Sequence, residues 1–179
     1  MKLVRWTRFT WNLADLPPAP PLAERYSLRP AHRDDFETVK HIILHTFTLD
    51  SAWCDSFSLV REWLAVQIDL AFERESAPAL VVQHGQRIIG ASALTTDVAA
   101  ESHLISGPCV FMEYQNRGLG SALLYYSLKQ LKNSGLERVN AVSKDNVAAA
   151  KFLYPKFGST SEAHDFELTG VGPRVRVDQ

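Results

Sequence analysis

The sequence predicts a mixed α/β (α+β) fold, in which helices flank both faces of a twisted, mainly antiparallel sheet. Two patterns predict it: β runs joined by a short turn in the first half, and alternating strand, helix, strand and helix in the second. The length of 179 residues, 46% of them hydrophobic, suits one core. We therefore expect a single domain over residues 26–179, preceded over residues 1–25 by a strand and a proline-rich lead-in.

The first part of the chain is expected to supply two short strands and two helices. Residues 2–11 are predicted as a strand, the prolines of "DLPPAPPLAER" as an extended tether, and "YSLRP" as a strand that ends at Pro30. A second helix is predicted from about Ser58, after a first one near residues 36–47. Apolar residues at helical spacing define the two helices: Phe36, Val39, Ile42, Ile43 and Phe47, then Leu59, Trp63, Val66 and Leu70.

A hairpin is predicted next, because "ALVVQHGQRIIGASALTT" contains two β runs joined at residues 84–86. A strand over about residues 103–111 leads into the stretch "QNRGLG", a helix over residues 119–132 and the strand "RVNAVS". The segment "DNVAAAKFLYPKFG" is predicted as a helix with Asp145 as its cap. Further β-like runs follow near residues 163–168 and 173–177.

The stretch "QNRGLG" places two glycines between a strand and a helix. Such a turn presents unpaired backbone N–H groups at the positive end of the helix dipole, which is a binding site for an anion. Glycine lets a phosphate approach the backbone closely and allows a positive φ. Arg117 either adds a charge-assisted contact or points to water. The chain has no "GK" dipeptide for a Walker A loop, and Leu123 stands where a Rossmann fingerprint needs its third glycine, so a nucleotide-binding regulatory domain is disfavoured.

At these residues the sequence resembles the GCN5-related N-acetyltransferase (GNAT) family, whose acetyl-CoA motif Q/R-x-x-G-x-G/A matches residues 115–120. Three other stretches agree with it. "GPCVFMEYQ" looks like the family's fourth strand, "NVAAAKFLYPKFG" like its N-x-x-A…Y-x-K-x-G helix, and "LRPAHRDD" like its opening. The resemblance covers roughly residues 26–158 and implies that acetyl-CoA is the co-substrate.

The resemblance also implies which residues hold the CoA. The pyrophosphate would lie on the loop and first helical turn that follow Gln115, namely Asn116, Arg117, Gly118, Leu119, Gly120 and Ser121. The pantetheine arm would lie along the strand at Cys109, Val110 and Phe111, and Asn146 would touch it. Because Pro108 cannot donate a hydrogen bond, we expect the N–H groups of Cys109 and Phe111 to face the arm.

The implied reaction is direct attack of a primary amine on the acetyl thioester. Tyr154 stands at the family's tyrosine position, and its phenol, with a pKa of about 10, would protonate the departing thiolate. Asn146 and Tyr154 are one residue further apart than the motif expects. Either the helix therefore contains a bulge or wide turn near Pro155, or the tyrosine is rotated away from the sulfur.

The acceptor is less defined than the cofactor. It is expected to be an amine on a small molecule or a peptide, and the residues do not single out a general base. Trp53, Phe57 and Trp63 belong either to the core or to the wall of the acceptor site. The alternative to an enzyme is a non-catalytic acyl-CoA-binding or sensing domain that keeps the anion site without the chemistry.

Charge and cysteine content limit the remaining possibilities. The net charge of −1 argues against nucleic acid as a partner, while residues 115–158 carry seven Lys or Arg against two acids, a field expected to receive the CoA phosphates. His41 and His45 have metal-ligand spacing without a third ligand, so no metal is expected. The two cysteines predict free thiols in a cytoplasmic protein, and no stretch has the pattern of a signal peptide or membrane span. A homodimer is a possible assembly.

Overall fold

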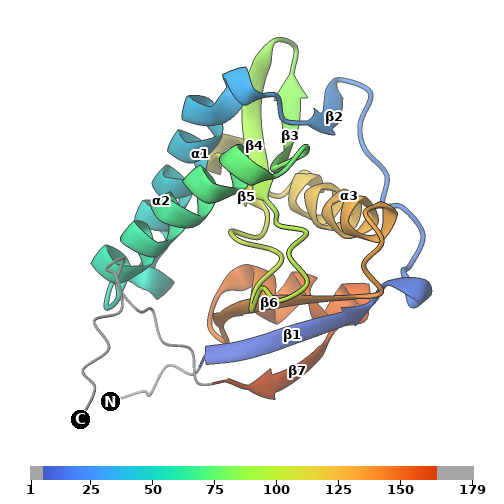
Figure 1. The fold of residues 1–179 in the computed structure, drawn as a ribbon. Helices are drawn as coiled ribbons and strands as arrows, with labels where there is room; N and C mark the ends of the chain where they lie inside the picture. The colour runs from blue at the N-terminus through green and yellow to red at the C-terminus, as the bar shows by residue number, and fades with distance from the viewer. Residues whose placement is uncertain (1–5, 165–179) are drawn as a thin grey trace.

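The computed structural model describes residues 6–164, which form two antiparallel sheets surrounded by helices (Figure 1). The strands are β1 (Trp6–Asn12), β2 (Tyr26–Pro30), β3 (Ala79–His84), β4 (Arg87–Ala93), β5 (Cys109–Val110), β6 (Arg138–Lys144) and β7 (Thr160–Ala163). The α-helices are α1 (Phe36–Leu49), α2 (Phe57–Arg74) and α3 (Leu119–Asn133). The mixed fold is confirmed, and its sheet is divided into two parts. The β-like run expected at 173–177 lies outside the described residues.

The larger sheet, in the order β2-β3-β4-β5, separates two layers of core. Side chains alternate across it, because Leu80 and Val82 of β3 lie in the cluster with α3 while Val81 lies in the cluster with α1 and α2. In Figure 1 the helices α1 and α2 lie on one side of β3 and β4, and α3 lies on the other. Gly85, with a φ of 61°, closes the predicted hairpin between β3 and β4.

The smaller sheet has the order β6-β1-β7, so the N-terminal strand is its central strand. Phe9 and Trp11 of β1 are 5% and 1% exposed, and they belong to the same buried cluster as Leu123 and Leu128 of α3. Strand β1 therefore shares a core with the rest of the fold, although the proline-rich segment separates it in sequence from β2.

Hydrogen bonds join the two sheets at one end. The carbonyl of Asn140 in β6 accepts the N–H groups of His103 and Leu104 at 2.8 and 3.3 Å, and the N–H of Val142 donates to Ser102 Oγ at 3.1 Å. Beyond these residues β5 pairs with β4, while β6 pairs with β1. The two strands consequently move apart and leave an opening between the sheets.

The strand expected over residues 103–111 is interrupted in the same region. Leu104 forms a bridge with Leu94, and pairing with β4 resumes at Cys109 in a register shifted by two residues. Gly107, with a φ of 63°, lies in the bulge between these points. Only the short β5, near the end of the expected strand, is therefore left.

Helix α2 buries a different face from the one suggested by the sequence. Val60, Leu64 and Ile68 are 3% exposed or less, whereas Leu59 is 53% exposed. Both sets have helical spacing, because apolar residues surround much of this helix. Packing against α1 and the larger sheet, rather than periodicity, selects the face that becomes buried.

The segment "DNVAAAKFLYPKFG" is not one α-helix. It contains a π-helical turn, Ala149–Leu153, followed by a 3₁₀ turn, Pro155–Phe157, and Asp145 lies in a turn before both. The N–H of Tyr154 donates to the carbonyl of Ala149, five residues earlier, at 2.9 Å. This wide turn absorbs the extra residue before Tyr154, and the expectation of a bulge near Pro155 is confirmed.

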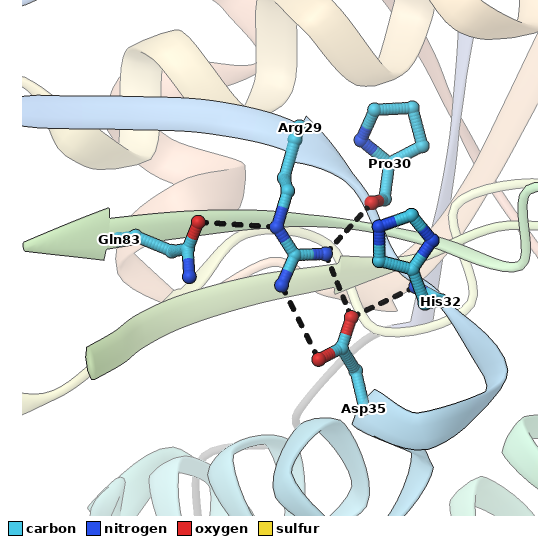
Figure 2. Close-up of polar contacts among 5 residues, drawn as sticks. All are labelled: Arg29, Pro30, His32, Asp35 and Gln83. Carbon is cyan, nitrogen blue, oxygen red and sulfur yellow. Dashed lines mark hydrogen bonds and ion pairs between the residues drawn. The ribbon is translucent and has the colours of Figure 1, made fainter. Parts of the chain in front are cut away.

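An ion pair fastens the start of the first helix to the larger sheet (Figure 2). The guanidinium of Arg29 in β2 donates to both carboxylate oxygens of Asp35, at 2.7 and 3.3 Å, and to Gln83 of β3 at 3.1 Å. Asp35 also accepts the backbone N–H of His32 at 2.8 Å. The hydrogen bond from Arg29 holds the pKa of Asp35 below its usual value. The charged carboxylate therefore stabilises the folded chain.

Replacing Asp35 by Asn should lower the free energy of unfolding at pH 7 by roughly 1.5–3 kcal/mol, the range for hydrogen bonds to charged groups. The folded pKa lies below the unfolded value of about 4, so the contribution is complete above that value and is lost as the pH falls through the folded pKa. Urea unfolding at pH 7 and at successively lower pH should show the difference from the unmutated protein shrinking. The exposed neighbour Asp34, changed to Asn, is the control, and an equal loss in both variants would contradict the assignment.

Candidate functional site

The glycine loop forms a row of free backbone N–H groups at the start of α3. Asn116 and Gly118 have φ values of 61° and 78°, and Gly118 is the N-cap residue of the helix. The first helical hydrogen bond runs from the N–H of Ala122 to the carbonyl of Gly118 at 3.1 Å, so the N–H groups of residues 119–121 lie outside the helical ladder. Left-handed residues next to right-handed ones turn successive N–H groups toward a common point. The loop can therefore bind an anion.

The guanidinium of Arg117 contacts protein groups beside the loop, and the side chain is exposed. Its guanidinium donates to the hydroxyl of Tyr26 at 3.1 Å and to the carbonyl of Glu113 at 3.0 Å, and it lies 5.2 Å from the centre of the Tyr114 ring. Arg25 and Arg117 together hold the pKa of Tyr26 below its usual value. Arg117 thus fixes the loop against β2, next to the backbone N–H groups that can receive an anion.

At the open edge of β5, the backbone N–H and carbonyl groups that face away from β4 are those of Val110. Phe111 donates its N–H to Ile89 of β4 at 3.0 Å, and because alternate residues of a strand face the same partner, the N–H of Cys109 also faces β4. The expectation that these two N–H groups face the arm is therefore wrong. Pro108, which has no N–H, shares with Val110 the side away from β4, where the ladder requires no donor. The carbonyl of Val110 accepts a hydrogen bond from Gln115 Nε2 at 3.2 Å.

Tyr154 points into the opening between the sheets from the side of the π-helical turn. Its ring meets Phe9 and Trp11 edge to face, with centroids 5.0 and 5.1 Å away, and it is 4% exposed. Its hydroxyl lies against Gly107, where a Cβ would be 2.4 Å from the oxygen. Glycine is thus required at residue 107 for the hydroxyl to reach the strand. Burial raises the pKa of Tyr154 well above its usual value.

Both thiols are free, with Cys54 exposed and Cys109 buried. Burial raises the pKa of Cys109 to about 12, with a smaller contribution from the charge of Asp50. The thiol of Cys109 therefore stays protonated, as expected of a small core side chain and not of a nucleophile.

Two hollows lie along the segment from Gly107 to Gln115. The edge hollow lies at the open edge of β5 and has about 730 Å³ when the open solvent at its mouth is included. Its lining residues are His45, Thr46, Leu49, Asp50, Ser51, Val110, Met112, Gln115 and Ala148. The tryptophan hollow, about 380 Å³ when the open solvent at its mouth is included, lies further along the strand at Gly107. Its lining residues are Trp6, Phe47, Trp53, Val60, Trp63, Leu64, Leu104, Ile105, Ser106, Gly107, Val142, Ser143 and Tyr154.

A sequence model described as the acetyltransferase (GNAT) family matches residues 36–158, more than half of the chain. The chain belongs to the GNAT family. The strands β1 and β2 precede the matched range, and β7 follows it. No curated protein sequence matches the chain at a significant level.

Solved structures share the fold of this GNAT protein at low sequence identity. GCN5-related N-acetyltransferases from Kribbella flavida and Sphaerobacter thermophilus are 16% and 19% identical to it, with TM-scores of 0.57 and 0.58. A Drosophila protein is 11% identical, with a TM-score of 0.62. Each match covers 90% of this chain but between 49% and 56% of the other. The chain therefore spans about half the length of these proteins.

The sequence reasoning missed Lys144, which is 2% exposed at the end of β6. Its ammonium donates to the carbonyl of Ala52 at 3.1 Å, pairs with Asp55, and lies 5.2 and 5.9 Å from the ring centres of Trp53 and Trp6. Lys144 holds the pKa of Asp55 below its usual value. Its charge is therefore already paired, unlike that of a basic residue open to the CoA phosphates, the group among which the sequence placed it. Spacing could not reveal this pair, because its members are 89 positions apart.

The other candidate residues remain at the surface. Gln115, Asn116 and Asn146 are exposed, and Asn146 lies in the turn after β6. The rings of His41 and His45 stack 5.5 Å apart on α1. Within residues 6–164 the structure brings together no group of three or more His, Cys, Asp or Glu that could hold a metal ion. No helix of this part of the chain is long and apolar enough to cross a membrane.

Proposed function

We propose that the protein is an N-acetyltransferase, which transfers the acetyl group of acetyl-CoA to a primary amine by direct attack of the amine on the thioester. The observation that carries this proposal is the alignment of three features along one opening. The N–H row of the glycine loop lies at one end, the open edge of Val110 in the middle, and the hydroxyl of Tyr154 against Gly107 at the other. An anion site, a strand edge and a hydroxyl in this order along the chain's fold correspond to the pyrophosphate, the pantetheine arm and the thioester of an acyl-CoA.

Three groups of this chain would hold the cofactor. The N–H groups of residues 116–121 would bind the pyrophosphate at the positive end of α3. The N–H of Val110 faces away from β4 and would donate to the pantetheine arm, as an added strand does. Asn146, exposed beside the opening, would contact the same arm, and the edge hollow would contain it. Cys109 and Phe111 would pack beneath the arm without donating to it.

Tyr154 would donate a proton to the departing sulfur. A phenol with a raised pKa is a weaker acid, so proton transfer from Tyr154 to a thiolate of ordinary pKa would be unfavourable. The same burial acts on the sulfur, however, since the neighbouring thiol of Cys109 has its pKa raised to about 12. A thiolate formed beside it would be an unusually strong base. Desolvation would therefore raise the pKa of the departing thiol in the same direction as that of Tyr154, so burial would not act on the phenol alone.

Acetyl transfer should be measured by mass spectrometry of acetylated product, with acetyl-CoA and a panel of primary amines. Product with any amine is expected if the protein is an enzyme. Calorimetry with acetyl-CoA provides the control, because a sensing domain would bind the cofactor and yield no product with any amine. Absence of both binding and product would overturn the acetyl-CoA assignment itself.

Gly120→Val should weaken acetyl-CoA binding by roughly tenfold or more, since a side chain there would stand beside the phosphate that the free N–H groups receive. A Cβ at this position would lie 3.8 Å from the nearest atom of Leu153, an ordinary contact, so the fold should tolerate the change. Titration calorimetry gives the affinity and thermal unfolding checks the fold. The smaller Gly120→Ala should have an intermediate effect. Unchanged affinity in a folded Val variant would place the pyrophosphate elsewhere.

Tyr154→Phe removes the hydroxyl and keeps the ring that packs on Phe9 and Trp11. We expect kcat to fall by roughly 100-fold or more, with little change in acetyl-CoA affinity, because general acid catalysis contributes about this much. Tyr126→Phe, the same change on α3 at a residue that lines neither hollow, is the matched control. Steady-state kinetics with an acceptor from the panel gives the result. Equal turnover in the two variants would leave the thiolate to water and make Tyr154 a packing residue.

A further inference from the structure

Aromatic side chains from four separate elements form the wall of the tryptophan hollow. Trp6 comes from β1, Phe47 from α1, Trp53 from the 3₁₀ turn that precedes α2, and Trp63 from α2. The centre of the Trp53 ring lies 5.8 Å from that of Trp6 and 5.0 Å from that of Phe47. Such a wall favours the binding of a ligand whose apolar surface and ring faces become buried against it.

The floor of this hollow is the place where the acyl transfer proposed above would occur. Ser106 and Gly107 of the strand segment line it, together with Tyr154, whose hydroxyl lies against Gly107. The edge hollow, lined by Val110 and Gln115, lies further along the chain toward the glycine loop. If the acetyl-CoA arm reaches Tyr154 from there, an acceptor amine must approach through the tryptophan hollow.

The charges around the hollow restrict which amines suit it. None of the described residues that line it carries a formal charge. Behind the wall, the ammonium of Lys144 lies over the rings of Trp6 and Trp53 and is paired with Asp55. Among the described lining residues a second cation would find no carboxylate to pair with, and the ammonium of Lys144 would repel it. An uncharged amine is favoured, because burial lowers the pKa of an amine.

We infer that the acceptor is a small primary amine with a single amino group and an aromatic or branched aliphatic body. This inference rests on the proposed acetyl transfer and assigns the substrate class of the same site. The amine loses one proton as its nitrogen forms the amide bond, the thioester C–S bond breaks, and the sulfur leaves as the CoA thiol. Polyamines, aminoglycosides and lysine-rich peptides are disfavoured by their additional positive charges.

The kinetic test compares 2-phenylethylamine and 3-methylbutylamine with spermidine and a short lysine-containing peptide, with acetyl-CoA as donor. We expect kcat/KM to be at least about tenfold higher for the two apolar amines, which is the size of effect that one apolar contact in a pocket produces. Preference for spermidine or for the peptide would overturn the inference while leaving acetyl transfer established.

A variant tests whether the acceptor binds in the tryptophan hollow. Trp63→Ala should raise KM for 2-phenylethylamine by about tenfold or more and leave acetyl-CoA affinity unchanged. Leu59→Ala is the matched control, since Leu59 lies on the same helix, is 53% exposed and does not line the hollow. Equal KM values in the two variants would overturn the assignment of the hollow.

Direct binding separates the two proposals. Calorimetry of 2-phenylethylamine with the protein and CoA should show binding that Trp63→Ala weakens and Leu59→Ala does not. Binding without product would contradict the acetyltransferase proposal and support an apolar amine as the ligand. Product from other amines without binding of 2-phenylethylamine would do the reverse.

Discussion

The separation of β5 from β6 is the constraint on which the rest of the site depends. Hydrogen bonds from Asn140 and Val142 hold the sheets together at one end, and beyond them each strand has a different antiparallel partner. The backbone of Val110 is left with an open edge because β6 does not reach it. The same gap brings Tyr154 and the tryptophans to one hollow at Gly107. A continuous sheet would bury the strand edge and close both hollows.

Strand β1 gives this opening its shape. As the central strand of the smaller sheet it pairs with both β6 and β7, and it supplies the two rings against which Tyr154 packs. Its first residue, Trp6, also lines the tryptophan hollow and lies over the ammonium of Lys144. This strand lies outside the range that the family model matches. The features that would select an acceptor thus come partly from a segment that the family pattern does not describe.

Local patterns were predictable and distant pairings were not. The glycine loop, the hairpin at Gly85 and the buried face of α1 depend on residues near one another in sequence, and the extra residue before Tyr154 correctly indicated a wide turn. The N–H directions in β5 were wrong because they depend on which neighbour forms the ladder. The buried face of α2 and the pairing of Lys144 likewise depend on segments that only the folded chain brings together.

Desolvation links the chemical steps that the proposed reaction requires. The environment that raises the pKa values of Tyr154 and Cys109 makes every isolated charge in the opening unfavourable. It would favour the neutral form of an entering amine and make a departing thiolate strongly basic. Proton release from nitrogen and proton uptake by sulfur are then both driven by avoidance of buried charge. Lys144 remains compatible with such a site because its own charge is paired with Asp55 and hydrogen-bonded to Ala52. An amine with a single amino group can enter uncharged after losing one proton and satisfies this constraint, whereas a polycation keeps further charges and does not.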